Sequence, residues 1–268
     1  MRLFRRSVEL TIGRVRVGPL RIAFRCKSDL KGDPNTAEVR IWNLAPETRA
    51  RLQEPKQAML VMAGYEEGIG QIFLGETREV THQRDGADLV TTVLAGDGDL
   101  ALRSRVNLSL AAGARVGDAL EKMASNLGVG VSGAVDKLRN GDIRGGLTQF
   151  VNGAAISGNG WKEFERLIES TGLEASIQGG QLQVLERGKA TQDDAVLLTP
   201  ETGLIGSPEP GQDGLVKVRS LLQQGIFPGR KIKVESISTS GLFRAITVEH
   251  SGDTHGPDWY TDAEATPL

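Results

Sequence analysis

The chain has 268 residues, 39% of them hydrophobic and 25% charged, with a formal net charge of −2, as is typical of a soluble folded protein with one large or two modest domains. Its one cysteine, Cys26, excludes an intrachain disulfide and a cysteine-based zinc cluster. We expect neither a membrane span nor an export signal, because no apolar run is long enough and Glu9 and Arg14 interrupt the only candidate signal peptide.

The start of the chain is basic and predicts a β-strand. Seven arginines and a single acid, Glu9, precede Lys27, and they alternate with apolar residues. This alternation favours a strand with one solvated or partner-facing side over a nucleic-acid-binding arm. The segment after Arg244 contains five acids and no lysine or arginine. The two opposite charges are therefore candidates for a contact between subunits.

The first zone of the chain, from Ser7 to about Gly98, predicts a series of strands separated by Gly, Asp, Pro or Asn. The predicted strands are residues 8–17, 20–28, 37–44, 58–65, 70–82 and 87–96. Residues 46–53 predict one short helix, with Pro46 in its first position.

The middle zone has helical periodicity. Residues 115–128 predict a helix that ends at Gly128, and residues 159–172 predict a second helix that is capped by Asn159 and ends at Gly172. The predicted buried faces are Val116, Leu120, Met123 and Leu127 in the first helix, and Trp161, Phe164, Leu167 and Ile168 in the second. Residues 173–186 predict a hairpin that turns at Gly179–Gly180. Between the helices, the Gly-rich segment 130–158 predicts a long exposed loop or mobile excursion.

The last zone returns to strands. The predicted strands are residues 196–206, 214–222, 230–237, 241–250 and 258–265. Residues 207–214, SPEPGQDG, predict a turn-rich break between the first two of them.

An internal similarity links the outer zones. Residues 80–91, VTHQRDGADLVT, and residues 248–261, VEHSGDTHGPDWYT, share V-x-H-x-x-D, then Asp, two apolar or aromatic residues and Thr. His82 and His250 occupy equivalent places at the end of a strand that enters a hairpin. A histidine present in both copies of a duplicated scaffold is more often structural than catalytic. The repeat therefore predicts two related β-barrels or sandwiches on either side of a small α/β insert.

This repeat also bears on the candidate chemistry of the final hairpin. We expect His250 to pack at the rim of a barrel with a ring nitrogen bonded to the turn, and Asp253 and Asp85 to accept backbone N–H bonds as turn residues. His255 has no counterpart in the first copy.

Two other uses of the final hairpin remain open. His250, His255, Asp253 and Asp258 could form a loop metal site, although a loop of this composition is already explained by turn chemistry. Trp259 and Tyr260 could form a stacking platform for carbohydrate, although burial at a seam of the barrel is the simpler interpretation. The sequence contains no G-x-S-x-G, H-E-x-x-H or Walker A motif.

Several segments resemble one known family, the baseplate hub proteins of contractile-tailed phages, also described as late control protein D-like. Residues 35–52 and 58–76 look like the first, tube-protein-like barrel of that family, and residues 108–129 and 160–185 resemble its small α/β insert. Residues 197–222 and 249–261 resemble its second barrel. The resemblance implies a mainly β fold with two tube-protein-like β-barrels and a small α/β insert. The first barrel would be residues 1–103, the insert residues 104–190 and the second barrel residues 191–268, which may also take strands from neighbouring segments.

The resemblance also implies a function. In that family, three subunits form a ring in which six barrels are arranged with pseudo-sixfold symmetry. The ring joins the tail tube to a central spike and lines the DNA channel. The resemblance implies a homotrimer without enzyme activity, cofactor or metal, located in the tail baseplate of the virion and assembled in the host cytoplasm. Its expected partners are a tail tube or distal tail protein on one face, a spike protein on the other, and other baseplate proteins. DNA would pass an acidic or neutral lumen without specific binding. The alternative is a metal-dependent cell-wall hydrolase or peptidase centred on His250, His255 and Asp253.

Overall fold

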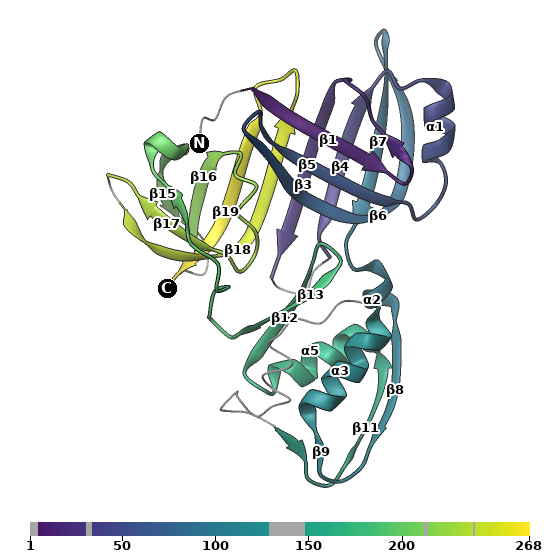
Figure 1. The fold of residues 1–268 in the computed structure, drawn as a ribbon, viewed down its shortest axis with the longest axis vertical. Coiled ribbons are helices and arrows are strands. Elements are labelled where there is room, and N and C mark those ends of the chain that lie inside the picture. Colours follow the sequence, from purple (N-terminus) through teal and green to yellow (C-terminus); the bar gives the residue numbers. More distant parts are fainter. Residues whose placement is uncertain (1–4, 31–33, 129–147, 212–213, 238) are drawn as a thin grey trace. The chain divides into compact units, whose positions relative to one another are not determined.

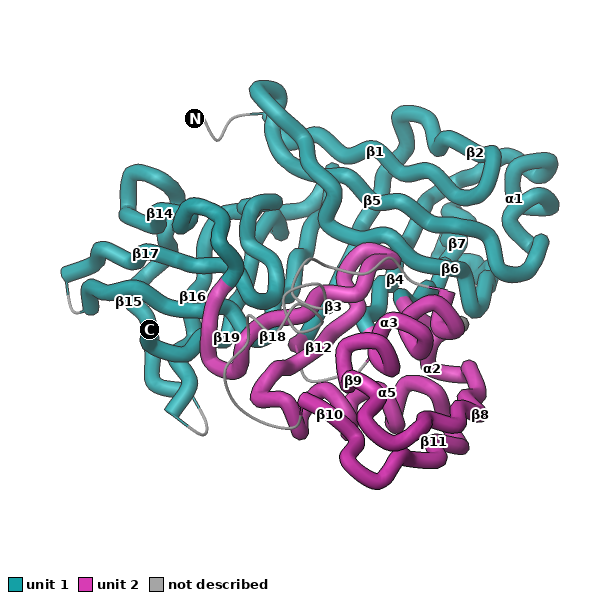
Figure 2. The backbone as a smooth tube through the Cα atoms, turned by 60° about the horizontal axis from the view of Figure 1, so that its bottom comes forward, with its two compact units in different colours: residues 1–29, 35–97, 191–268 teal, residues 30–34, 98–190 magenta. Residues whose placement is uncertain are grey.

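The structure is a computed structural model that describes residues 5–30, 34–128, 148–211, 214–237 and 239–268. The chain forms two compact units (Figure 2). Unit 1 comprises residues 1–29, 35–97 and 191–268, and unit 2 comprises residues 30–34 and 98–190. No helix in the described ranges is long and apolar enough to cross a membrane.

Unit 1 is almost entirely β-structure (Figure 1). Its strands from the first zone are β1 (Arg6–Ile12), β2 (Val15–Arg16), β3 (Ile22–Asp29), β4 (Thr36–Trp42), β5 (Ala58–Tyr65), β6 (Gly68–Asp85) and β7 (Asp88–Gly96). Its strands from the last zone are β14 (Val196–Leu198), β15 (Leu204–Pro210), β16 (Val216–Leu221), β17 (Lys231–Glu235), β18 (Ser240–Asp253) and β19 (Trp259–Pro267). The helix α1 (Pro46–Leu52) begins at Pro46 as predicted, and a 3₁₀ turn, η1, spans Pro200–Thr202.

These strands form one sheet that runs through both zones. Among the described residues thirteen strands pair in the order β15-β16-β19-β18-β3-β4-β7-β6-β5-β1-β2, with β17 and β14 branching from β18. The mainly β character expected from the sequence is confirmed. No pairing in the described ranges joins β15 to β2, so the sheet does not close, and the two predicted barrels are not separate closed structures in it.

The two zones meet because β18 is long enough to pair with different strands along its length. Residues Ser240–Arg244 pair with β17, and residues Thr247–Asp253 pair with β3. The register between β18 and β19 shifts between Ala245 and Thr247, at the point where β18 changes partner. A β-bulge bends a strand and increases its local twist, which redirects the second half of β18 towards β3.

Each zone of the sheet nevertheless packs around its own core. The first core lies between strands of the first zone and includes Leu10, Val39 and Met59, together with Trp259 from the last zone. The second core is made by the last zone alone and includes Leu198, Ile232 and Val248. Period-two burial along β3 and β4 places their apolar residues in the first core and their charged residues on the opposite face.

One predicted break in the last zone lies elsewhere than expected. Residues 207–210 belong to β15, whereas the strand expected over residues 196–206 is interrupted at Thr199. There the Thr199 side chain accepts from the Thr202 N–H and the Thr202 side chain accepts from the Thr199 N–H. This reciprocal capping stabilises one turn of 3₁₀ helix within an apolar run.

Unit 2 contains the α/β elements. Its elements are α2 (Asp99–Arg103), β8 (Arg105–Leu110), β9 (Ala114–Arg115), α3 (Val116–Leu127), β10 (Gln149–Phe150), β11 (Ala154–Asn159), α5 (Gly160–Glu169), β12 (Leu173–Gln178) and β13 (Gln181–Glu186). Both predicted helical stripes are buried in one core, and the Asn159 side chain caps α5 by accepting from the Lys162 N–H at 2.9 Å. The hairpin turn at Gly179–Gly180 is confirmed, with φ values of 60° and 77° that suit glycine.

The Gly-rich segment 130–158 differs in part from the prediction. Residues 129–147 lie outside the described residues, and residues 154–159 form β11, which pairs with β8. The exposed loop predicted there is therefore wrong for β11. This strand buries a single large apolar residue, Ile156, so its alternation is too weak to reveal a strand in the sequence.

Candidate functional site

The two repeated segments form matching hairpins, β6–β7 and β18–β19. In the first hairpin His82 lies opposite Thr91, and in the second His250 lies opposite Thr261. The imidazole Nδ1 lies 3.0 Å from the threonine hydroxyl in the first hairpin and 2.9 Å from it in the second. The equivalence of His82 and His250 predicted from the sequence is confirmed, down to the atom that each ring uses.

His250 is a buried structural histidine whose two ring nitrogens both form hydrogen bonds. Its Nε2 lies 3.1 Å from the Ile226 carbonyl, which can only accept, so Nε2 carries the proton. Nδ1 then accepts from the hydroxyl of Thr261, and that hydroxyl in turn accepts from the Gln223 N–H at 2.9 Å. The ring thus bonds to the facing strand and to the loop after β16, whereas the sequence predicted a bond to its own turn. Burial lowers the pKa of His250 to about 4, despite the opposing hydrogen bond to Ile226.

His82 occupies a more open site with the other tautomer. Its Nε2 lies 2.9 Å from the amide nitrogen of Gln53, which donates, so His82 carries its proton on Nδ1 and donates to Thr91. Partial burial and the nearby charge of Arg49 lower the pKa of His82. The two copies therefore preserve the histidine–threonine pair while differing in burial and in the second partner of the ring.

Asp253 organises the turn of the second hairpin. Its carboxylate accepts from Nε and Nη2 of the Arg21 guanidinium, at 3.3 and 2.7 Å, and from the His255 backbone N–H at 2.9 Å. Partial burial opposes ionisation of Asp253, but the hydrogen bonds from Arg21 and His255 outweigh it and hold the pKa of Asp253 below its usual value. The predicted role of Asp253 as a turn residue is confirmed.

Arg6, the first residue of β1, also binds the turn of the second hairpin, although β1 is far from β18 and β19 in the strand order. Its guanidinium donates to the carbonyls of Gly256 at 2.6 Å and Pro257 at 2.9 Å, and it lies 5.6 Å from the centre of the Trp259 ring. The basic start and the acidic end of the sequence therefore meet within one chain, through Arg6, Arg21 and the turn. The contact between subunits that the charge distribution suggested is not needed to explain these charges.

These contacts already engage two of the three residues on which the hydrolase alternative depends. His250 is buried with both ring nitrogens bonded, and Asp253 pairs with Arg21. His255 is exposed and its Nδ1 lies 2.9 Å from the hydroxyl of its neighbour Thr254. In the part of the chain that the structure describes, no group of three or more His, Cys, Asp or Glu side chains has an arrangement that could hold a metal ion.

Trp259 and Tyr260 point to opposite faces of β19. Trp259 is only 1% exposed and packs edge-on against Phe24, with ring centres 5.4 Å apart. Tyr260 is half-buried on the other face, beneath Arg219 at 4.4 Å. Neighbouring residues of a strand cannot present one surface, so a joint carbohydrate platform of Trp259 and Tyr260 is wrong. The expected burial of Trp259 at a seam is confirmed.

The repeat provides a matched test of the turn. We expect Asp253→Ala to lower the free energy of unfolding by about 1–3 kcal/mol, because it removes charge-assisted hydrogen bonds to Arg21 and to the backbone. Asp85→Ala, the same change in the exposed turn of the first hairpin, is expected to cost less than about 0.5 kcal/mol. Urea denaturation of both variants measures the difference. Equal losses in the two variants would show that Arg21 adds nothing to the second turn.

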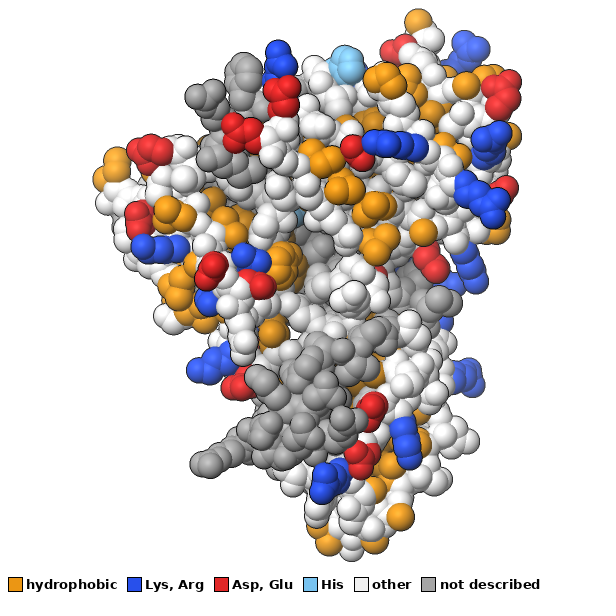
Figure 3. All heavy atoms as spheres, in the orientation of Figure 1, with side chains coloured by type: hydrophobic (Ala, Val, Ile, Leu, Met, Phe, Trp, Pro, Cys, Tyr) orange, Lys and Arg blue, Asp and Glu red, His pale blue; other side chains and the backbone are white. Residues whose placement is uncertain are grey.

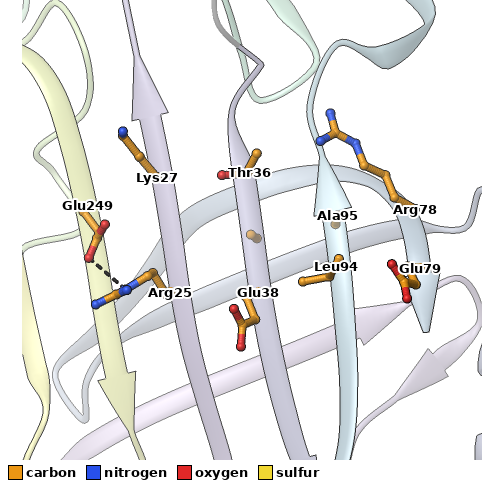
Figure 4. A pocket seen from close by; sticks show the side chains of 10 residues that line it. Arg25, Lys27, Thr36, Glu38, Arg78, Glu79, Leu94, Ala95 and Glu249 are labelled. Atoms are coloured by element: carbon orange, nitrogen blue, oxygen red, sulfur yellow. Dashed lines mark ion pairs between the residues drawn. The ribbon is translucent and has the colours of Figure 1, made fainter. Parts of the chain in front are cut away.

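The outer face of the central strands carries a second feature, which the sequence reading missed. Two adjoining hollows of about 400 and 390 Å³ lie on the solvated face of β18, β3, β4, β7 and β6. Figure 4 shows the first of them. Arg25 and Glu38 line both hollows. The signal was present as the alternation of charged and apolar residues along β3 and β4, but their pairing with β18 was needed to assemble the face.

Ion pairs cross this face. Arg25 on β3 pairs with Glu249 on β18 at 3.0 Å, drawn as a dashed line in Figure 4, and Arg40 pairs with Glu38 on β4 at 2.7 Å. Further along the sheet, Lys217 and Arg219 on β16 face Glu264 and Asp262 on β19 at 3.8 and 3.6 Å. On the side of the molecule that Figure 3 shows, basic and acidic side chains are likewise interspersed. The face is therefore polar and balanced in charge.

The fold was compared with those of known proteins. No protein-family model and no curated protein matches the sequence. Among solved structures, the 43 kDa tail protein of prophage MuSo2 from Shewanella oneidensis is similar over 98% of both chains, with 10% identity and a TM-score of 0.68. The tail protein from Neisseria meningitidis MC58 is similar over 98% of this chain and 96% of its own, with 12% identity and a TM-score of 0.66.

A third similar structure comes from a secretion system. It is an E. coli protein described as a component of the type VI secretion system, with structural similarity to the tail proteins gp27 and gp5 of bacteriophage T4. The similarity covers 97% of this chain and 76% of that protein, with 13% identity and a TM-score of 0.65. At such low identities the comparison concerns architecture alone. The chain thus has, over nearly its whole length, the fold of phage tail proteins and of this secretion-system component.

Proposed function

We propose that this protein is a structural component of a phage tail, without enzyme activity, that acts as a hub of the baseplate. The observation that carries the proposal is the similarity of fold to two tail proteins over 98% of this chain. The third similar structure, itself described as similar to T4 tail proteins, adds support. The protein would be located in the tail of the virion after assembly in the host cytoplasm.

The proposed assembly is a homotrimeric ring with pseudo-sixfold symmetry. A duplicated element gives each subunit two similar edges, so three subunits present six, which suits a junction between a sixfold tube and a threefold spike. The matched hairpins around His82 and His250 and the separate cores of the two zones support such a duplication. The two tube-like halves would be residues 1–103 and 191–268, with residues 104–190 as the insert.

The proposed ring joins a tail tube or distal tail protein on one side to a separate spike protein on the other, among further baseplate proteins. It would line a channel through which DNA passes without specific binding. The charge-balanced face of β18, β3 and β4 supports this part of the proposal, because a lumen without excess positive charge does not retain phosphates.

Mass and shape of the purified protein test the proposal. We expect mass photometry to give a species near three times the 28.7 kDa of the chain, and negative-stain images to show a threefold ring with a central hole. Assembly with the tube or spike partner is the second condition to test, because such rings can require a neighbour. A compact monomer under both conditions would contradict the hub.

A further inference from the structure

We infer that Glu249 and Glu38 mask the arginines of β3 and β4 from phosphate, so that nucleic acid passes this face without being held. The inference rests on the proposed function for its biological meaning and adds to it the residues that set the affinity for DNA. It concerns the outer face of β18, β3 and β4, where Arg25 and Glu38 line both hollows; Figure 4 shows the hollow that Lys27 and Glu249 also line.

The basic residues of this face form a row that would bind a polyanion if no acidic side chains lay beside it. Arg25 and Lys27 point to the same side of β3, roughly 6.6 Å apart along the strand. Arg40 lies on the same face of the neighbouring strand, two residues from Glu38. Basic side chains clustered on one face bind nucleic acid without regard to sequence.

Each carboxylate is placed between two of these cations. Glu249 forms its ion pair with Arg25 and lies directly opposite Lys27 in the register of β18 and β3. Glu38 bonds to Arg40 and lies directly opposite Arg25 in the register of β3 and β4. Two carboxylates therefore serve three basic side chains, and the pairing of β18 with β3 brings the first of them into position.

The two hollows together are neutral. Their basic lining residues are Arg21, Arg25, Lys27, Arg40 and Arg78, and their acidic ones are Glu38, Glu79, Glu249, Asp253 and Asp258. Equal numbers of each sign leave no net field to concentrate an anion at the surface.

The masking is electrostatic and not steric. The side chain of Arg25 is 69% exposed and that of Arg40 is 57% exposed, so a phosphate can reach both. Removing the carboxylate charge while keeping the shape of the side chain should therefore uncover them. Glu249→Gln and Glu38→Gln make this change, and glutamine retains an oxygen that can accept from arginine.

The test is binding of fluorescently labelled double-stranded DNA, measured by anisotropy on the full chain. We expect no saturable binding by the wild-type protein and clear binding by the variant with both Glu38→Gln and Glu249→Gln. Because two uncovered arginines release about two counterions, the affinity of this variant should fall roughly tenfold between 50 and 200 mM salt. Adding Arg25→Gln and Arg40→Gln to it should abolish the binding.

A matched control separates masking from net charge. Glu169→Gln with Glu186→Gln makes the same change in charge at exposed positions of unit 2 and should leave DNA unbound. Four results would each overturn the inference. They are DNA binding by this control equal to that of the Glu38/Glu249 variant, tight DNA binding by the wild type, no gain of binding in the Glu38/Glu249 variant, and a gain that persists after Arg25 and Arg40 are replaced. This test can succeed or fail independently of the proposed function. If the protein forms no ring but its Glu38/Glu249 variant gains DNA binding, the inference about the masked face stands and the proposal of a baseplate hub fails.

Discussion

Replacing Trp259 with alanine is expected to lower the free energy of unfolding by about 3–5 kcal/mol, the range for removing a large aromatic side chain from a core. Trp259 is 1% exposed and belongs to the core of the first zone, although it lies on β19 near the end of the chain. It packs edge-on against Phe24 and lies beneath the guanidinium of Arg6. Its loss would open a cavity where the two zones of the sheet share side chains.

The geometry around Trp259 leaves little room for relaxation, because a Cβ at Gly252 would collide with both Phe24 and Trp259. Urea denaturation measures the loss of stability, and Tyr260→Ala is the matched control. Tyr260 is the next residue and only half-buried, on the other face of the strand, so its truncation should cost clearly less. Trp259→Phe should recover part of the loss. Equal effects of Trp259→Ala and Tyr260→Ala would contradict the assignment of Trp259 to the core.

The second large effect concerns pH. Burial lowers the pKa of His250 from the ordinary histidine value of 6.5 to about 4, so the folded protein favours the neutral ring. The stability that this provides is complete above the unfolded pKa and is lost as the pH falls from about 6.5 towards 4. Between about pH 7.5 and 4.5 the loss due to His250 alone is expected to be about 2–3 kcal/mol.

Variants isolate His250 from the carboxylates that also titrate in acid. The free energy of unfolding of His250→Gln should change less between the two pH values than that of the wild type, even though the variant starts from a lower stability at neutral pH. His82→Gln removes a half-buried ring whose pKa is also lowered, so it should weaken the pH dependence, but less than His250→Gln does. An unchanged pH dependence in His250→Gln would show that this ring is not the acid-sensitive group.

The features that the sequence predicted correctly are those that depend on nearby residues. The stripe of α3 from Val116 to Leu127 repeats every turn of a helix, and the glycines at 179 and 180 match one type of hairpin turn. The equivalence of His82 and His250 was also visible, because each histidine and its threonine lie in one hairpin, nine and eleven residues apart. Such contacts leave a pattern within a short window.

Other features had no local signal. β11 shows too little alternation to be recognised as a strand, and it depends on pairing with β8. Predicting that the zones form separate barrels missed the pairing of β18 with β3, because local periodicity does not specify which strands become neighbours. The partners of His250 outside its hairpin, Gln223 through Thr261 and Ile226 directly, were likewise unpredictable from spacing.

The sequence by itself determined a mainly β chain with two related hairpins and a helical segment between them, because hydrophobic periodicity and turn residues act over a few positions. Only the tertiary structure decided what the charged residues do. Arg21 and Asp253 are 232 residues apart in sequence, and Arg25 meets Glu249 only because β18 lies beside β3. The final hairpin, rich in His and Asp, could be interpreted as a metal site until its partners were known. Those partners are an arginine, a threonine and backbone groups brought in by long-range strand pairing, for which the energy comes from burying the opposite face of the sheet.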